Sequence, residues 1–365
     1  MRKLKLAALL LVPIMLAAAV PTEALSLSAK SSIVLEATTG QVVYEMDADT
    51  RRPMASTTKI MTALCAIESG DLSREICVAP EAAGIEGSSI YLEAGDRLTL
   101  ESLIWALMLE SANDAAAAIA IGVSGSVEAF AELMNKKAAD LGLENTHFTN
   151  PHGLSDENHY TTARDLATLS AYAMNNETFR EIVSADTHKI EVGDTVRHLH
   201  NHNKMLHLYD GAVGVKTGFT KVSGRCLVSA AERDGVTLVA VTLDAPDDWD
   251  DHTEMLDLGF SSLERLTLIE AEESAMILPC IGGEKTEFII KNRDGLSLIL
   301  PREEHNITRR IILPHYFWAP VTEGEQVGRI EFYDGETLLG EVGLYACESV
   351  SRVEYEKSLF DKIFN

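Results

Sequence analysis

Three short groups of polar residues stand in settings that could support nucleophilic chemistry. Ser56 and Lys59 lie three positions apart, just ahead of an apolar stretch with helical periodicity at residues 60–68. This spacing predicts that Ser56 lies at a helix start and that Lys59 follows one turn later on the same face, within reach of the hydroxyl. A Ser hydroxyl becomes a nucleophile when a neighbouring base takes its proton, and Lys is a base only when it is neutral. The alternative is an ordinary N-cap Ser beside a solvated Lys.

The second and third groups follow in the same half of the chain. Ser111-Ala112-Asn113 falls between two helical stretches, residues 100–109 and 114–122, where capping is the alternative interpretation. Lys216-Thr217-Gly218 precedes two strand-like runs, residues 226–231 and 237–243, and is predicted to lie in the first strand of an antiparallel set. Glycine at that place lets a substrate backbone approach closely. A second cation such as Lys216, together with burial, would lower the pKa of Lys59.

In this order and these settings, the three motifs resemble those of the serine D-alanyl-D-alanine carboxypeptidases, the low-molecular-mass penicillin-binding proteins. The resemblance runs from about residue 30 to about residue 350 and includes Gly87-Ser88-Ser89, residues 148–154 and residues 160–165. It implies an α/β (α+β) transpeptidase- or β-lactamase-like domain, with an antiparallel sheet and a helical subdomain, followed by a small all-β domain.

The resemblance also assigns roles to residues. Ser56 would attack the carbonyl of the penultimate D-Ala, Lys59 would take its proton, and Ser111 would relay a proton to the leaving amine. The substrate-binding set would hold the substrate amide, grip the terminal carboxylate and supply backbone N–H groups for the oxyanion. Its members are Asn113, Lys216, Thr217, Gly218 and Phe219. Phe219 stands where some relatives carry His, so only its backbone role carries over. For an Arg that relatives place upstream of the third motif, the rough match is His202, with Lys204 nearby.

The activity implied by the resemblance is removal of the terminal D-Ala from peptidoglycan stem pentapeptides through a Ser56 acyl-enzyme, with inhibition by penicillin and other β-lactams and with no cofactor. A D,D-endopeptidase acting on peptidoglycan cross-links would use the same chemistry. An inactive peptidoglycan-binding protein is the alternative from another class, and the intact motifs weigh against it. A β-lactamase is disfavoured because the second motif is Ser-Ala-Asn and a β-rich module is superfluous for that task.

One segment has a rival interpretation as a metal site. His198, His200 and His202 alternate with other residues, so on a strand the three imidazoles would share a face. Three His can bind zinc, although no H-E-x-x-H or C-x-x-C motif accompanies them. We therefore expect no metal, and a polar, partly exposed segment at this place.

The N-terminus indicates an exported protein. Three cations in the first five residues precede an apolar run at residues 6–20, and the pattern predicts a signal peptide over residues 1–24, cleaved after Ala24. An uncleaved membrane anchor is the alternative. We expect the protein outside the cytoplasm, in the cell wall or at the outer face of the cytoplasmic membrane. A net charge of −25 disfavours nucleic acid as a partner.

Composition divides the rest of the chain. We expect the catalytic DD-peptidase domain at residues 25–265, a β-rich domain at 270–350 and a short amphipathic tail at 351–365. The tail is equally consistent with peripheral contact with the membrane and with a helix that closes the β-rich domain. The five Cys are odd in number and widely spaced. Cys65 and Cys226 are predicted in the core, and a disulfide through Cys77 or Cys280 stays open.

Overall fold

The computed structural model describes residues 25–193 and 195–354. The chain divides into two compact units between Leu263 and Glu264. The predicted signal peptide and residues 355–365 of the predicted tail lie outside the described residues.

The first unit is built on a five-stranded sheet with the order β2-β1-β9-β8-β7, in which every neighbouring pair is antiparallel. The strands are β1 Ser31–Glu36, β2 Val42–Met46, β7 Ala212–Thr220, β8 Gly224–Arg233 and β9 Val236–Leu243. A tight turn joins β8 to β9, and both of its central residues, Asp234 and Gly235, have positive φ (51° and 75°). That conformation matches the right-handed twist of the two flanking antiparallel strands, as in other two-residue hairpins.

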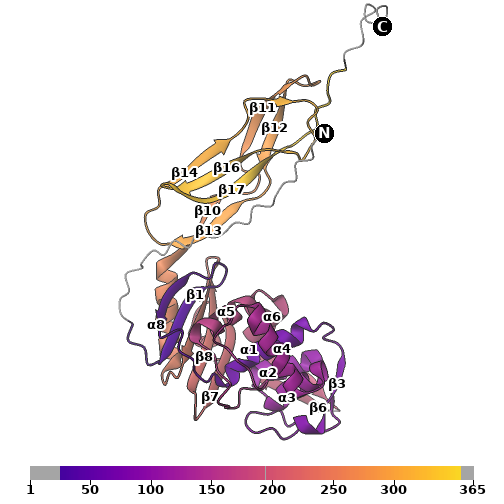
Figure 1. Cartoon of the computed structure of the whole chain (residues 1–365), viewed down its shortest axis with the longest axis vertical. Helices are drawn as coiled ribbons and strands as arrows, with labels where there is room; N and C mark the ends of the chain where they lie inside the picture. Colours follow the sequence, from indigo (N-terminus) through magenta and orange to yellow (C-terminus); the bar gives the residue numbers. More distant parts are fainter. Residues whose placement is uncertain (1–24, 194, 355–365) are drawn as a thin grey trace, which may run out of the picture. The chain divides into compact units, whose positions relative to one another are not determined.

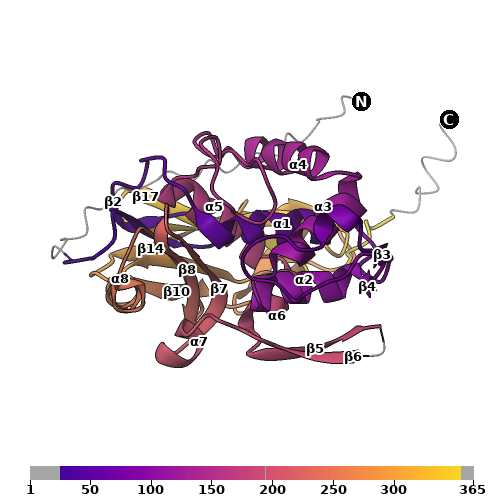
Figure 2. The same cartoon turned by 90° about the horizontal axis from the view of Figure 1, so that it is seen from below.

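Helices cover both faces of this sheet, as Figures 1 and 2 show. On one face α8 (Asp248–Ser262) packs so closely that its Gly259 leaves no room for a Cβ beside Leu238 of β9. On the other face Ile33, Val239 and neighbouring apolar side chains join the main core with the helices of the subdomain. Alternate residues of each strand therefore point to opposite layers, and both layers are buried.

The helical subdomain surrounds the first helix of the chain. Its helices are α1 Lys59–Glu68, α2 Leu100–Leu109, α3 Asn113–Ser124, α4 Val127–Asp140, α5 Ala163–Met174 and α6 Glu177–Ser184. Shorter elements connect them: η1 Ala55–Thr58, β3 Glu75–Cys77, η2 Pro80–Ala82, β4 Arg97–Thr99, β5 Thr187–Val192, β6 Thr195–His200 and α7 Met205–Leu208. The first two turns of α3 are rich in Ala and fully enclosed, because small side chains allow neighbouring helices to approach closely. No single helix among the described residues is long and apolar enough to cross a membrane, although the bent pair α3 and α4 meets that test of length and composition together.

The second unit is all β, which confirms the predicted fold class. A six-stranded sheet has the order β14-β16-β17-β12-β11-β15, and β10 pairs with β13 apart from it. The strands are β10 Leu263–Ile269, β11 Ala275–Ile281, β12 Glu287–Asn292, β13 Leu296–Pro301, β14 Ile307–Ile312, β15 Phe317–Trp318, β16 Gln326–Asp334 and β17 Thr337–Ala346. Phe288, Ile290, Ile330 and Leu344 lie at the centre of its separate core.

Candidate active site

Ser56 lies in a tight turn that leads directly into α1. The turn is the 3₁₀ helix η1, and α1 continues from it at Lys59. Ala55, just before Ser56, adopts a left-handed backbone conformation with a φ of 49°. The N-cap of the turn is Met54 and makes no side-chain cap. The alternative of an N-cap Ser is therefore wrong, and the Ser56 side chain is directed elsewhere.

Lys59 Nζ has three oxygen neighbours, and Ser56 supplies one of them. The Nζ–Oγ distance to Ser56 is 2.9 Å, the distance to Oδ1 of Asn113 is 2.7 Å, and the distance to the backbone carbonyl of His152 is 2.6 Å. The two carbonyl oxygens can only accept hydrogen bonds. A neutral amine has two N–H groups and one lone pair. When both N–H groups serve the carbonyls, the lone pair faces the Ser56 hydroxyl, which is the arrangement a general base requires.

The surroundings of Lys59 favour that neutral form. The side chain is fully buried, so a solvated Lys is excluded. Burial lowers the pKa of Lys59 well below its usual value, and the charge of Lys216 lowers it further, while the carboxylate of Asp114 opposes the shift. Burial also lowers the pKa of Lys216, to about 7. Burial and mutual repulsion therefore disfavour two positive charges on Lys59 and Lys216 together at neutral pH.

The second motif lies at the junction between α2 and α3. Ser111 has a φ of 57°, and its hydroxyl has no hydrogen-bond partner within the described part of the chain. The N-cap of α3 is Ala112, without a side-chain cap, so the capping alternative is wrong for this helix start. The Asn113 amide instead connects two parts of the site, because Oδ1 accepts from Lys59 and Nδ2 donates to the carbonyl of Glu86 at 2.5 Å.

The third motif lies on β7, the edge strand of the sheet. Lys216 is buried and its Nζ donates to the carbonyl of Thr217 at 3.1 Å, whereas the Phe219 side chain is 65% exposed. One side of β7 pairs with β8 through the register Thr217↔Leu227 and Phe219↔Arg225. An edge strand leaves a row of backbone N–H and C=O groups unpaired on its other side, where an extended peptide can add as a further strand.

Gly218 brings this strand against the nucleophile turn. A Cβ on Gly218 would lie 3.0 Å from the backbone nitrogen of Ser56 and 3.2 Å from that of Thr57. The first and third motifs are therefore neighbours in space, although 160 residues separate them in the chain. Glycine at this position lets the strand and the turn meet backbone to backbone.

The segment at residues 145–165, which carries no predicted site residue, completes the surroundings of Lys59. His152 supplies its carbonyl oxygen, and a Cβ on Gly153, whose φ is +91°, would collide with the carbonyl oxygen of Ala55. His159 lies behind the same turn. Its Nδ1 accepts from the backbone N–H of Thr149 at 3.1 Å, so Nε2 carries the proton and donates to Oγ1 of Thr58 at 2.7 Å.

Both of these histidines are neutral. Burial lowers the pKa of His152 to about 3 and that of His159 to about 4. The predicted site omits both. The sequence carries a weak signal for them, because residues 148–154 belong to the family resemblance, but the role of a backbone carbonyl leaves no mark on residue type.

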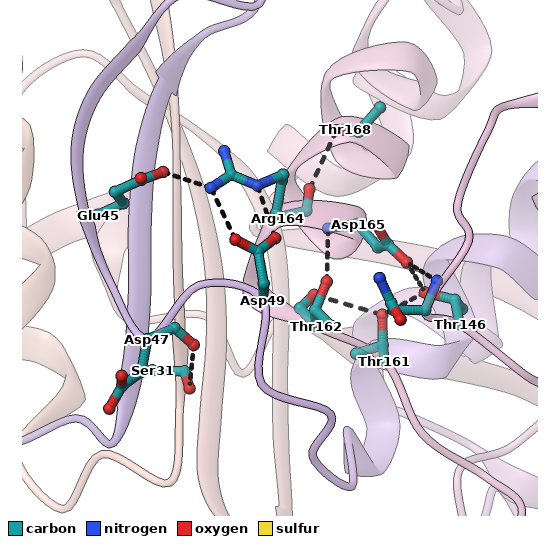
Figure 3. A network of polar contacts seen from close by, with 11 residues as sticks. Ser31, Glu45, Asp47, Asp49, Thr146, Thr161, Thr162, Arg164, Asp165 and Thr168 are labelled. Atoms are coloured by element: carbon teal, nitrogen blue, oxygen red, sulfur yellow. Dashed lines mark hydrogen bonds and ion pairs between the residues drawn. The ribbon is translucent and has the colours of Figure 1, made fainter.

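A polar network anchors the far end of this segment to the sheet hairpin and to the start of α5 (Figure 3). Asp165 accepts from the backbone N–H of Asn145 and from the Thr146 hydroxyl, both at 2.8 Å. The Arg164 guanidinium binds the carboxylates of Asp49 and Glu45 at 2.7 and 2.6 Å, and its hydrogen bond lowers the pKa of Asp49. The ends of the segment 145–165 are therefore anchored away from the nucleophile, while His152 and Gly153 in its middle lie against the Ser56 turn.

The other residues singled out in the sequence lie apart from these contacts. Strand β6 ends at His200, so His202 does not share a strand face with His198, and its Nε2 lies 3.3 Å from a carboxylate oxygen of Glu110. The described residues include no group of three His, Cys, Asp or Glu side chains placed to hold one metal ion. All five Cys are free thiols. Burial raises the pKa of Cys65 to about 12 and that of Cys226 to about 11, so neither is a thiolate nucleophile.

The arrangement is suited to acyl transfer. It combines a hydroxyl facing a neutral amine, a backbone edge for an extended peptide, and a second buried lysine for an anionic group.

Comparison with known families divides the chain at the same place as the structure. The family described as "D-alanyl-D-alanine carboxypeptidase" matches residues 17–247, and the family described as "Penicillin-binding protein 5, C-terminal domain" matches residues 264–352.

Individual proteins agree over most of the length. The D-alanyl-D-alanine carboxypeptidase DacF of Bacillus subtilis is 31% identical over 329 residues, which cover 87% of this chain and 85% of DacF. DacC of Escherichia coli is 30% identical over 88% of this chain and 84% of its own. Among solved structures, the carboxypeptidase DacD of Francisella tularensis has a TM-score of 0.64 at 26% identity, covering 90% of this chain and 95% of its own. The DD-transpeptidase of Streptomyces K15 has a TM-score of 0.61 at 32% identity, covering 65% and 98%.

Proposed function

The chain belongs to the D-alanyl-D-alanine carboxypeptidase family of serine peptidases, and from that premise we propose that it is an exported, penicillin-sensitive enzyme that removes the terminal D-Ala from peptidoglycan stem pentapeptides. The contact that carries the proposal is the 2.9 Å approach of the buried Lys59 Nζ to Ser56 Oγ. A fully buried amine that faces a hydroxyl and two carbonyl oxygens is poised to accept a proton.

The first half-reaction forms an acyl-enzyme. Ser56 Oγ attacks the carbonyl carbon of the penultimate D-Ala while its proton passes to Lys59 Nζ. The backbone N–H groups of Ser56 and Phe219 stabilise the oxyanion. The C–N bond then breaks, the leaving amine receives a proton through the Ser111 hydroxyl, and free D-Ala departs. The hydroxyl of Ser111 has no hydrogen-bond partner among the described residues and belongs to the same helix junction as Asn113, whose amide orients Lys59, which supports this relay.

The second half-reaction restores the enzyme. Water attacks the ester carbonyl, and Lys59, neutral again after the proton has left through Ser111, takes the proton from the water. The ester bond to Ser56 Oγ breaks, the oxygen regains a proton, and the shortened peptide leaves with a new carboxylate.

Binding of the substrate uses the edge strand. The stem peptide adds to β7 as an extended strand, with the amide of Asn113 on the opposite side. Lys216 and Thr217 bind the terminal carboxylate, and the buried position of Lys216 strengthens an ion pair with a group that itself becomes buried.

Inhibition by β-lactams follows from the same attack. When Ser56 opens the lactam ring, the leaving nitrogen stays tethered to the acyl group and continues to block the approach of water. We propose that penicillin forms a long-lived ester on Ser56.

We also propose an extracytoplasmic location, because the predicted signal peptide over residues 1–24 precedes the catalytic domain. N-terminal sequencing of the protein recovered from outside the cytoplasmic membrane is expected to begin at Leu25. Recovery of the intact N-terminus would contradict cleavage. Retention in the cytoplasm would contradict export.

The decisive experiment measures release of free D-Ala from a defined pentapeptide that ends in D-Ala-D-Ala. The purified wild type is compared with Ser56→Ala, which keeps the fold and removes the nucleophile. Release by the wild type alone, with a mass increase of one penicillin on the wild type alone, is the expected result. Release only from cross-linked muropeptides would assign an endopeptidase. Absence of both release and labelling would leave a binding protein without activity.

A further inference from the structure

Asp114 is a charged side chain that the proposed mechanism does not use, although it follows Asn113 directly. Its exposure is 0%, and no cation contacts its carboxylate within the part of the chain that the structure describes. Removing a carboxylate from water costs several kcal/mol unless other groups replace the lost hydration. Asp114 therefore requires a dense set of hydrogen-bond donors.

Four donors surround this carboxylate, and all four are neutral. Oδ2 accepts from the Ser89 hydroxyl at 2.6 Å and from the backbone N–H of Leu92 at 2.9 Å. Oδ1 accepts from the backbone N–H of Ile90 at 3.3 Å and from that of Ala115 at 2.9 Å. Each group donates and none accepts, so the site fits the ionised, acceptor-only form of an Asp side chain.

Three of these donors belong to one loop, residues 86–92, which also holds Asn113. The carbonyl of Glu86 accepts from Asn113 Nδ2 at 2.5 Å, and the carbonyl of Ser88 accepts from the backbone N–H of Asn113 at 2.7 Å. With Nδ2 committed to the loop, the amide oxygen of Asn113 faces Lys59. Gly87, between the two carbonyls, has a φ of +98°, and a Cβ on it would lie 2.7 Å from Asn113 Nδ2. The loop and the amide therefore fit one another without spare room.

Resting on the proposed function, we infer that Asp114 is a positioning residue for acylation. Its carboxylate fastens loop 86–92 to the start of α3, so that the loop fixes the orientation of the Asn113 amide and thereby holds the Lys59 amine against the Ser56 hydroxyl.

The charge of Asp114 gives this role a signature that simple bracing would lack. Among the charges that act on Lys59, Lys216 lowers the pKa of the amine and Asp114 raises it, and the nearby His152 and His159 are neutral. Replacing the carboxylate by an amide removes the opposing charge. The pKa of Lys59 then falls further, and the acid limb of kcat/KM moves to lower pH.

The test compares Asp114→Asn with the wild type and with Asp71→Asn. Asp71 also accepts from a Ser hydroxyl and a backbone N–H, at 2.6 and 3.0 Å, but it lies in an exposed turn. Because the introduced amide offers an N–H to a site made only of donors, we expect acylation by a fluorescent penicillin to slow about 10- to 100-fold. The acid limb should shift to lower pH. Asp71→Asn should match the wild type in both.

Acylation within threefold of the wild type by folded Asp114→Asn would overturn the inference. Slow acylation with an unmoved acid limb would reduce Asp114 to a structural brace and would also overturn it. If Asp114→Asn does not fold, Ser89→Ala decides the question, because it keeps the charge and removes one donor. If Ser89→Ala is acylated more slowly and its acid limb does not move, the inference is supported. If Ser89→Ala is acylated at the wild-type rate, the inference is overturned.

Hydrogen exchange separates this inference from the proposed function. In the free protein the backbone N–H groups of Ile90 and Leu92 are expected to exchange at least tenfold faster in Asp114→Asn, whatever the substrate of the enzyme. Unchanged exchange would overturn the role of the carboxylate in the loop, even if the wild type releases D-Ala. An inert wild type with faster exchange in the variant would instead count against the proposed function.

Discussion

Gly218 of β7 meets the turn of Ser56 so closely that a Cβ on the glycine would lie 3.0 Å from the Ser56 backbone nitrogen. The nearest atoms are the backbone nitrogens of Ser56 and Thr57 and the Cβ of Ala55, none of which can rotate away as the end of a flexible side chain can. The spacing between the edge strand and the nucleophile thus depends on the absence of one methyl group.

Gly218→Ala is therefore expected to slow acylation by about tenfold or more, because the strand and the nucleophile must separate by a few tenths of an ångström. Stopped-flow labelling by a fluorescent penicillin measures the rate. Gly193→Ala is the control: its φ of +57° adds a backbone strain that Gly218→Ala lacks, but the new Cβ meets open space in the β5–β6 turn, so the site should acylate at the wild-type rate. Equal rates for the two variants would contradict the account of the close approach.

The pH dependence of substrate binding is expected to follow Lys216. Burial lowers its pKa to about 7, so the free enzyme loses the Lys216 charge as the pH rises through about 7. A neutral amine attracts a carboxylate weakly, so KM for a pentapeptide should rise on the alkaline side, with a smaller change in kcat. A pentapeptide with an amidated C-terminus should show no such rise in KM. An identical alkaline limb for both peptides would exclude Lys216 as the carboxylate ligand.

Replacement of Lys216 by Met should stabilise the protein while it impairs substrate binding. Below pH 7 the folded protein holds a buried positive charge on Lys216. Between pH 7 and about 10.5 the folded protein has released this proton, whereas the unfolded chain still binds it. The unfolded state then binds more protons, so stability rises with pH between about 7 and 10.5 and is lowest below pH 7. The shift corresponds to a cost on the order of 3–5 kcal/mol, which Lys216→Met would recover at pH 6.

Urea unfolding at pH 6 measures this gain in the free energy of unfolding. Lys221→Met, at an exposed position in the next turn, should leave the free energy within about 0.5 kcal/mol of the wild type. A Lys216→Met protein less stable than the wild type would show that the charge is compensated within the folded state.

Acid should destabilise the protein through its buried histidines. His252 of α8 is fully buried, and burial lowers its pKa from 6.5 to about 3. Below pH 6.5 the His252 side chain binds a proton in the unfolded chain but stays neutral in the folded protein. The stability that depends on neutral His252 is therefore fully present above pH 6.5 and is lost as the pH falls toward 3. Between pH 7 and pH 5 the loss from His252 alone is about 2 kcal/mol.

The measurement is the free energy of unfolding of His252→Gln at both pH values. The variant should lose less stability than the wild type on acidification, while His198→Gln, on the exposed face of β6, should lose as much. A pH dependence of His252→Gln equal to that of the wild type would refute the assignment.

Many local features of this protein follow from the residue types of short stretches of the sequence. The placement of Ser56 and Lys59 one turn apart is a property of helical periodicity, so their contact could be predicted without a tertiary structure. The helix at Leu100–Leu109 and the hairpin turn at Asp234-Gly235 follow in the same way from apolar periodicity and from residues that accept positive φ. The family resemblance rests on these local features.

Strands β11 and β15 of the β-rich domain carry little local signal of their own. Ala275–Ile281 contains a Pro, and Phe317–Trp318 is only two residues long. The alternation of His198, His200 and His202 does not place three imidazoles on one strand face, because β6 ends at His200 before the pattern does.

Only the tertiary structure could decide what makes Lys59 a base. Its two carbonyl partners come from 54 and 93 residues away in the chain, and one of them is a backbone atom that any residue could supply. The burial that shifts its pKa, the approach of Lys216 and the opposing carboxylate of Asp114 all arise from packing between distant segments. Residue types and spacing thus specify which groups can react, and the fold sets their protonation and their distance, because both depend on neighbours that the chain brings together only when it is packed.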